Sequence, residues 1–473
     1  MPPFRRPPHA APTRLPPREA LDLGETDVLI AGGGPAGLGA ALGAAAAGAR
    51  VVLVERYGFL GGNATAALVM PIASYYTELP ADAHGASEGP GLLVPQDHGA
   101  GAPIIGGALR TLVERLVQAG GAIAPSRSTG FVVPFDAEVF KTVALDLLDD
   151  AGVQFLLHAF ASGVVGAGGA PGVVFETKSG PVVLRAKVVV DCTGDGDVDA
   201  QAGAAFDCGR KEDGLMQPMS LMFLMAQFEQ EAFRAYVASH PGQWKGVYGL
   251  WDLVRQAAEA GELDLPREDI LLFSTPHAHE AAVNSTRVTN VSGTDVFDLT
   301  YAEREGRRQV RRIAAFLRKY VPGFEDAYLQ QSGAAIGVRE SRCIRGRYVI
   351  TAEDILSARK FDDAIAHGTY PIDIHNPAGR GTILKRVPPG EAYDIPLRCL
   401  IPEAPDSLLV AGRCISGTHE ALSSYRVMPI SMATGQAAGV CAALSARNAV
   451  PAHRIDPDDV RAELRRQGAI LLH

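Results

Sequence analysis

The stretch that decides the fold reads "DVLIAGGGPAGLGAALGAAAAGARVVLVERYGFLGGNAT" and spans residues 27–65. Two β-branched runs, at 28–31 and 51–55, flank a segment made almost entirely of Gly and Ala. In a βαβ unit, such glycines let the chain turn tightly, admit a pyrophosphate to the backbone and allow the helix to pack closely on the sheet. The spacing therefore predicts a helix over 35–47 and a dinucleotide site at its N-terminus.

Glu55 at the end of the second run makes this prediction more specific. A carboxylate at this offset accepts both hydroxyl protons of the adenosine ribose and repels a 2′-phosphate. The N-terminus of the helix supplies oriented N–H groups and a partial positive charge to the pyrophosphate. A turn packed only for structural reasons would not require an acid at this position.

Composition limits the partners and the compartment. The chain has 473 residues, a formal net charge of −9 and 47% hydrophobic residues. This charge argues against nucleic acid or an anionic membrane as the main partner, and favours a small molecule or a protein. The six cysteines are widely spaced, which fits the reducing cytoplasm. Residues 1–24 are rich in Pro and Arg without an apolar core segment, so we expect a disordered tail and not a signal peptide.

Apolar strands alternate with Ala/Leu-rich helical segments, which is typical of an α/β fold. Helices are expected over 105–119 and 136–151, followed by a β-meander that ends in a strand at 187–191. The expected domains are a dinucleotide-binding domain formed by 25–204 and 400–450, a lid-like insertion at 75–103, a substrate or cap lobe at 205–399, and a C-terminal helical tail at 451–473.

A nicotinamide enzyme would usually continue with further βα units, whereas this chain passes through a meander and returns to the sheet. Blocks that carry a resemblance follow in order: "GGGPAGLGAA", "ERYGFLGGNAT", "VVVDCTGDGDVDAQAGA", "RESRCIRGRYVITAEDI", "FDDAIAHGTYPIDIHNP", "YDIPLRCLIP" and "LLVAGRCISGTHEALSSYRVMPISMATGQAAG". The chain resembles the two-dinucleotide-binding-domain flavoproteins, and more closely the FAD-dependent oxidoreductase family related to heterodisulfide reductase A-like proteins. The resemblance implies a discontinuous, Rossmann-like FAD-binding domain of the GR2 type with a β-meander, and an inserted α+β substrate/cap lobe.

The resemblance also assigns residues to non-covalently bound FAD. The implied cofactor contacts are Gly32, Gly33, Gly34, Pro35, Ala36, Gly37, Glu55, Arg56, Gly61, Gly62, Asn63, Thr65, Ala161, Thr193, Gly194, Asp195, Gly412 and Arg413. Arg413 departs from the pattern, since many flavoproteins of this fold have Asp there. The helix that begins near Met428 is expected to direct its N-terminus at the flavin C2 carbonyl and N1, where reduction builds negative charge.

The predicted catalytic residues come from blocks within and after the middle lobe. They are His375, His419, Arg339, Arg342, Arg398, Tyr393 and Arg426. A histidine would take a proton from the substrate while its carbon faces the flavin, and arginines would grip a carboxylate. The alternative is that these charges form ion pairs between the lobes and that the histidines are structural.

Other motifs predict less. The "GAGGAP" run from Gly166 is followed by a strand and therefore indicates a turn. The basic segment 302–319 has an apolar helical stripe, so it is interpreted as an amphipathic helix and not a nucleic-acid patch. A 4Fe-4S cluster needs grouped thiolates, and the cysteine spacing does not predict one, nor any other metal site.

The function predicted from the sequence is that of an FAD-dependent oxidoreductase that moves hydride or electrons between flavin and a small polar substrate, with arginines suited to an anionic one. Two alternatives stay open: a flavin-binding electron-transfer subunit that works with a partner protein, and a flavin monooxygenase. The sequence identifies neither the substrate nor the electron acceptor, and a homo-oligomer is compatible with it.

Overall fold

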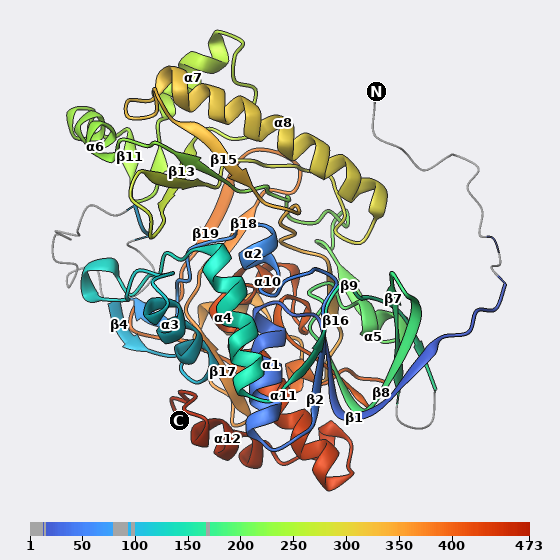
Figure 1. Cartoon of the computed structure of the whole chain (residues 1–473). Helices are drawn as coiled ribbons and strands as arrows, with labels where there is room; N and C mark the ends of the chain where they lie inside the picture. The colour runs from blue at the N-terminus through green and yellow to red at the C-terminus, as the bar shows by residue number, and fades with distance from the viewer. Residues whose placement is uncertain (1–12, 14–15, 79–92, 96–99, 167–170) are drawn as a thin grey trace.

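The computed structural model describes residues 13, 16–78, 93–95, 100–166 and 171–473. Figure 1 shows the two parts of the molecule: a lower part built around a parallel sheet, and an upper part under the long helix α8. Three predicted features lie wholly or largely outside the described residues: most of the tail at 1–24, most of the insertion at 75–103, and the centre of the turn that begins at Gly166.

The lower part is a parallel sheet with a meander attached, which is consistent with a Rossmann-like FAD-binding fold. Its parallel strands are β5 (Gln154–Leu156), β2 (Val51–Val54), β1 (Leu21–Ala31), β8 (Gly180–Asp191) and β21 (Leu408–Val410). The antiparallel meander continues from β8 through β7 (Gly172–Thr177) to β6 (Phe160–Val165). The expected α/β class is confirmed at this level.

Strand β8 belongs to both parts of this sheet. One edge pairs with β1 from Val182 to Asp191. The other edge pairs with β7 over 180–185 and with β21 over 189–191. The same long strand therefore carries the meander and leads into the cofactor end of the parallel sheet. Strand β1 begins at Leu21, within the predicted tail.

Two helices of small residues pack directly on each other beside the sheet. They are α1 (Pro35–Ala46) and α11 (Met428–Asn448). A Cβ on Gly435 would lie 2.0 Å from the carbonyl oxygen of Ala36, and one on Gly439 would lie 2.0 Å from that of Ala40. The backbones approach so closely that only glycine fits, which explains the Gly/Ala composition of both segments.

Further helices flank this core. The predicted helices at 105–119 and 136–151 correspond to α3 (Ala108–Gln118) and α4 (Ala137–Asp150). The side chain of Asp136 caps α4 by accepting from the backbone N–H of Glu138 at 2.6 Å. The remaining helices of the lower part are α2 (Asn63–Ala66), α5 (Asp197–Gln201), α9 (Ala352–Leu356), α10 (His419–Tyr425) and α12 (Pro457–Arg466), the last within the predicted helical tail.

The upper part, which we call the cap, has its own core formed mainly by residues 219–338. Its antiparallel sheet has the order β11 (Trp244–Lys245), β12 (Tyr248–Gly249), β13 (Ile270–Ser274), β14 (Glu280–Val283), β10 (Phe223–Ala226), β15 (Tyr328–Ser332). Its helices are α6 (Gln230–Ser239), α7 (Trp251–Glu259) and α8 (Val296–Tyr320). Val310, Ile313 and Leu317 of α8 are buried in the cap core, as expected for an amphipathic helix.

The predicted lobe at 205–399 is distributed over both cores. Apolar residues from Cys343 to Leu400 pack in the core of the lower part and not in that of the cap. The small sheets in the lower part pair β16 (Arg342–Ile344) with β9 (Phe206–Cys208), β17 (Ala364–Gly368) with β20 (Tyr393–Pro396), β18 (Ile372–His375) with β19 (Thr382–Lys385), and β3 (Tyr76–Glu78) with β4 (Ala100–Pro103). The inserted lobe is thus smaller than the sequence suggested, and the chain re-enters the lower part well before residue 400.

Within the described ranges, no single helix has the length and apolar character needed to cross a membrane.

Candidate active site

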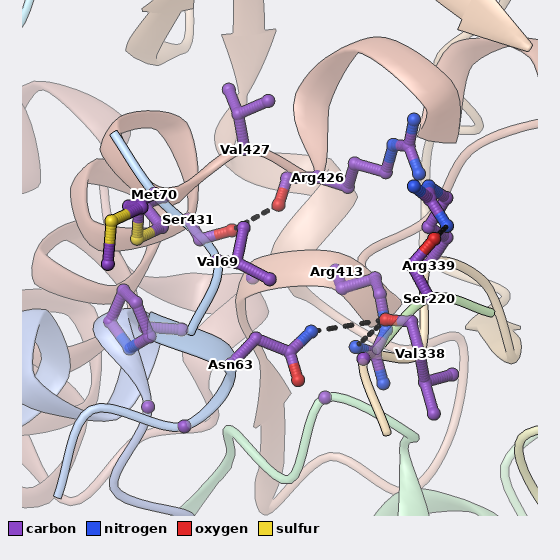
Figure 2. A pocket seen from close by; sticks show the side chains of 18 of the residues that line it. Asn63, Val69, Met70, Ser220, Val338, Arg339, Arg413, Arg426, Val427 and Ser431 are labelled. Carbon is purple, nitrogen blue, oxygen red and sulfur yellow. Dashed lines mark hydrogen bonds between the residues drawn. The ribbon is translucent and has the colours of Figure 1, made fainter. Parts of the chain in front are cut away.

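A cavity of about 620 Å³ extends from the glycine turn of the parallel sheet to the cap. At one end it is lined by the N-terminus of α1 and the end of β2, and at the other by cap residues such as Leu271 and Phe273. The N-terminus of α11 also lines the cavity, and Figure 2 shows Ser431 next to Val69 and Met70. The cavity therefore connects the predicted dinucleotide site with the predicted substrate lobe.

Glycine occupies the three positions of the motif for different structural reasons. Gly32 has φ +105°, and a Cβ there would lie 2.3 Å from the carbonyl oxygen of Cys192. A Cβ on Gly37 would lie 1.8 Å from the carbonyl oxygen of Gly32. A Cβ on Gly34 would meet no described atom closer than 3.6 Å, and this residue lines the cavity. Gly32 and Gly37 are thus required for packing, whereas Gly34 leaves open the space beside the helix N-terminus.

Glu55 connects this turn to the end of β2. Its two carboxylate oxygens accept from the backbone N–H of Gly33 at 2.6 Å and of Tyr57 at 2.9 Å. Burial raises the pKa of Glu55, although the two N–H donors oppose the shift. No side chain caps α1, whose first residue is Pro35, so its N-terminal N–H groups remain available to an anion.

Most of the predicted cofactor residues line the cavity. Those that line it are Gly32, Gly34, Pro35, Ala36, Glu55, Arg56, Gly62, Asn63, Ala161, Thr193, Gly194, Gly412 and Arg413. The others, Gly33, Gly37, Gly61, Thr65 and Asp195, are not among the lining residues and support the turns behind it. The Thr65 hydroxyl, for example, donates to the carbonyl of Leu60 at 2.6 Å.

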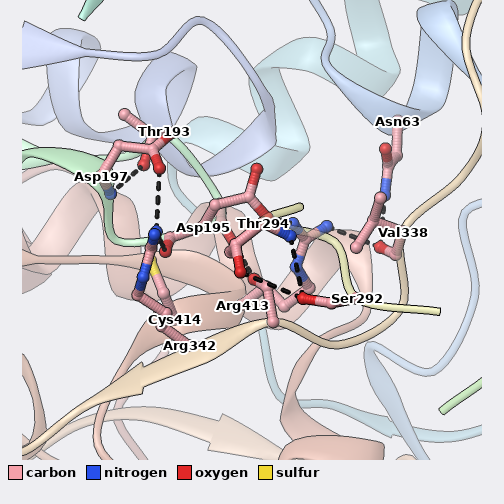
Figure 3. A network of polar contacts seen from close by, with 12 residues as sticks. Asn63, Thr193, Asp195, Asp197, Ser292, Thr294, Val338, Arg342, Arg413 and Cys414 are labelled. Atoms are coloured by element: carbon pink, nitrogen blue, oxygen red, sulfur yellow. Dashed lines mark hydrogen bonds and ion pairs between the residues drawn. The ribbon is translucent and has the colours of Figure 1, made fainter. Parts of the chain in front are cut away.

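Arg413 joins the cofactor end to the connection that leads out of the cap. Its guanidinium contacts the carboxylate of Asp195 at 2.5 Å and the carbonyl of Val338 at 2.6 Å (Figure 3). The Asn63 amide donates to the same carbonyl at 3.1 Å. Arg413, the residue that departs from the flavoprotein pattern, therefore joins three segments that lie far apart in the sequence.

Arg342 belongs to the neighbouring part of this network and not to the cavity lining. It donates to the backbone carbonyl of Asp195 and to the carboxylate of Asp197, both at 2.9 Å. Asp191, which sequence reasoning did not select, accepts from the backbone N–H of Val198 at 2.8 Å and holds the start of α5. These contacts fix the return loop after β8, next to the cofactor end of the cavity.

Only three of the predicted catalytic residues, Arg339, Arg426 and His375, line the cavity. The others have structural partners outside its lining. His419 contacts Glu340 at 2.7 Å, and the Tyr393 hydroxyl lies 2.7 Å from Ser424 in the core. Arg398 forms a two-point ion pair with Asp363 at 2.9 and 3.0 Å, and its side chain is 47% exposed. These contacts are compatible with structural roles for the three side chains, although the Arg398–Asp363 pair lies within the lower part and does not join the lobes.

His375 lines the cavity, but both of its ring nitrogens are engaged. Arg287 approaches Nδ1 at 3.0 Å, and because a guanidinium only donates, Nδ1 must accept. Nε2 then carries the proton and faces the Asp373 carboxylate at 3.4 Å. Burial lowers the pKa of His375 to about 3, so the ring is neutral near pH 7. This arrangement does not support the predicted role of His375 as a base.

Asp373 is the centre of the polar cluster next to the cap. It accepts from the Tyr370 hydroxyl at 3.0 Å and lies 3.6 Å from Arg426. Burial opposes its ionisation, but His375 and Arg426 hold the pKa of Asp373 well below its usual range. Sequence reasoning missed Arg287, because no motif marks it and its contacts join segments distant in the chain. It also did not select Tyr370, although this residue lies in one of the blocks that carry the resemblance.

The described residues contain no group of three His, Cys, Asp or Glu side chains arranged to hold a metal ion. The six cysteines are free, and all except Cys208 are buried.

The profile of the FAD dependent oxidoreductase family matches residues 27–464. The chain belongs to this family. It is an FAD-dependent oxidoreductase, and the cavity lining fits the cofactor, because it combines an uncapped helix N-terminus, a glycine with open space beside it and a buried acid.

No curated protein matches the chain. Solved structures match with low identity. The p-nitrophenol 4-monooxygenase PnpA from Pseudomonas putida is 11% identical, with a TM-score of 0.47 and coverage of 93% of this chain and 83% of that one. A geranylgeranyl bacteriochlorophyll reductase-like protein from Thermoplasma acidophilum is 13% identical, with a TM-score of 0.42 and coverage of 93% and 82%. The similarity at these values does not extend to substrate or reaction.

Proposed function

We propose that the chain transfers hydride or electrons between FAD and a small polar substrate that occupies the cap end of the cavity. The observation that carries this proposal is the continuity of the cavity, which is lined by the glycine turn at one end and by Arg339, Arg426 and His375 at the other. Asn284 adds a polar contact: it lines the cavity, and its buried Oδ1 has no hydrogen-bond partner among the described residues. A cavity that continues from the cofactor turn to a set of cationic and polar side chains favours an enzyme with its own substrate over an electron-transfer subunit.

FAD, when bound, supplies the redox chemistry, and the protein supplies binding and orientation. We propose that the N–H groups at the start of α1 and the Glu55 carboxylate hold the dinucleotide. Ser431, whose hydroxyl donates to the carbonyl of Arg426 at 3.2 Å, fixes the start of α11 beside the middle of the cavity. The partial positive charge at this helix N-terminus would favour negative charge that develops nearby.

The test is anaerobic. Purified holoenzyme is mixed with a panel of polar metabolites, and loss of the yellow flavin absorption is followed by spectrophotometry. Bleaching by a metabolite supports direct oxidation of that substrate. Absence of bleaching would instead support the monooxygenase alternative if, in a separate aerobic assay, the enzyme consumes oxygen and this uptake depends on a reduced nicotinamide and on an added substrate. Bleaching only by a reduced partner protein would support the electron-transfer subunit.

A further inference from the structure

Arg339 differs from the other arginines that the sequence suggested as substrate-binding residues. Its Nη1 donates to the carbonyl of Pro218 at 2.8 Å and to the hydroxyl of Ser220 at 2.7 Å. Within the described part of the chain, no carboxylate lies within 4.0 Å of its guanidinium, the distance that defines an ion pair. Arg426 is already neutralised by Asp373 and donates to two backbone carbonyls. Arg339 is therefore a cation held in place by neutral groups alone.

The contacts of Arg339 occupy one side of its guanidinium. Its Nε and Nη2 have no hydrogen-bond partner among the residues that the structure describes, and the side chain lines the cavity beside Arg426 (Figure 2). A guanidinium binds a carboxylate through two parallel N–H···O bonds, and an Nε–Nη2 edge provides such a pair. The Nε–Nη2 edge of the Arg339 guanidinium is therefore available to bind a carboxylate.

The electrostatic environment of Arg339 also favours the binding of an anion. Burial, followed by the like charge of Arg426, lowers the pKa of Arg339 to about 9, although the Asp373 carboxylate opposes the shift. The side chain of Arg339 is half-buried and has no ion-pair partner among the described residues, so an anion bound next to it removes part of the cost of burying its charge. Arg287 does not compete for this role, because it does not line the cavity and it donates to the carbonyls of Gly379 and Gly381 and to His375.

The rest of the chamber is largely apolar. Its walls include Met222, Val247, Leu271, Phe273 and Leu384. Such side chains exclude water and bind a hydrocarbon or aromatic surface, whereas a small, fully hydrophilic acid would leave them without contacts. Charge at one position and apolar area around it together select an amphipathic ligand.

We propose that the substrate is a carboxylate with an apolar body, and that its carboxylate pairs with the Nε–Nη2 edge of Arg339. This inference rests on the proposed function, because it places the substrate in the same cavity. It narrows the four arginines suggested by the sequence to one, since Arg342 and Arg398 lie outside the cavity lining and Arg426 has an acid partner.

The experiment compares benzoate and phenylacetate with their neutral analogues benzamide and phenylacetamide. Binding to the holoenzyme is measured by calorimetry and by perturbation of the flavin spectrum. The variants are Arg339→Gln, Arg339→Lys and, as a matched control, Arg398→Gln. We expect Arg339→Gln to weaken binding of the acids about 10- to 100-fold, the range for a charged hydrogen bond. Arg339→Lys should restore only part of the affinity, because Lys lacks the planar fork. Arg398→Gln should bind like the parent.

Equal binding of acids and amides by the parent, no detectable binding of either acid at millimolar concentration, or unchanged acid affinity in Arg339→Gln would each overturn the inference. The comparison of acids with amides uses the parent protein only, so it holds even if an Arg339 variant folds poorly. Binding of benzoate requires no electron transfer. A parent that binds benzoate through Arg339 while no metabolite bleaches its flavin would therefore contradict the proposed function and leave this inference intact.

Discussion

Gly34 and Gly37 belong to the same motif, yet the structure predicts opposite consequences for their substitution. In Gly34→Val, the new Cβ meets no described atom closer than 3.6 Å, and the backbone is extended with φ −73°. Replacing a Gly at a helix N-cap by an aliphatic residue costs about 1 kcal/mol. The variant should therefore fold, but its side chain fills the space through which the pyrophosphate reaches the N–H groups of α1.

The magnitude follows from ligand linkage. Free FAD at about 100 times its dissociation constant stabilises a binding protein by about 2.7 kcal/mol. We expect the thermal midpoint of the parent to rise with added FAD and that of Gly34→Val to stay constant. Gly37→Ala places a Cβ 1.8 Å from the carbonyl oxygen of Gly32 and should lower the midpoint with or without FAD. Gly379→Val is the control, because nothing lies within 4 Å of its Cβ.

The assay is thermal denaturation followed by fluorescence, together with the flavin released per protein on denaturation. Parental flavin occupancy and a parental response to FAD in Gly34→Val would refute the reasoning, because they would show that Gly34 does not border the pyrophosphate. A lower midpoint for Gly34→Val in the absence of FAD, as large as that of Gly37→Ala, would show that the motif acts only in packing.

Three further predictions concern stability and activity. Gly439→Ala should lower the thermal midpoint, because its Cβ would lie 2.0 Å from the carbonyl oxygen of Ala40 and force α1 from α11. Burial raises the pKa of Glu55, so its contribution to the unfolding free energy is greatest in acid and declines as the pH rises through the raised pKa; denaturation of Glu55→Gln across pH should lack that decline. Arg398→Gln removes the ion pair with Asp363, in which the arginine is half-exposed and the carboxylate is largely buried, and should lower the unfolding free energy by about 1 kcal/mol, with the rate of flavin reduction by substrate unchanged.

The cofactor end of the cavity could be predicted from the sequence because its determinants are local. Gly32, Gly34 and Glu55 lie within one βαβ unit, so their spacing alone indicates the turn, the helix and the acid. The first part of β1 was not predicted, because it lacks such a local signal. Residues 21–25 are exposed and lack the apolar pattern of a strand, and their pairing with β8 is set by a segment far along the chain.

The cap end could not be resolved in the same way. Arg339 and Arg398 are the same residue type in similarly polar blocks, but one lines the cavity and the other pairs with Asp363 outside its lining. The difference depends on contacts such as that between Arg339 and Ser220, which are 119 positions apart in the chain. Sequence spacing indicates that such residues are present, whereas only the tertiary structure shows which charge lacks a partner.

The arrangement around Asp373 bears on the chemistry that the cavity can assist. Its ionised carboxylate receives the Tyr370 hydroxyl and faces His375 and Arg426, so its oxygens are surrounded by donors. His375 is neutral, with its lone pair directed at Arg287. A carboxylate surrounded by donors and a histidine without a free nitrogen hold protons in place and are poor at removing them from a substrate. This cluster therefore acts in positioning: it fixes Arg426 beside Arg339 and compensates the charge of Arg426, which leaves Arg339 as the one of the two without an acid partner among the described residues. A substrate bound through its carboxylate is compatible with this role. The carboxylate is already ionised at neutral pH, so its binding requires no proton transfer by the cluster.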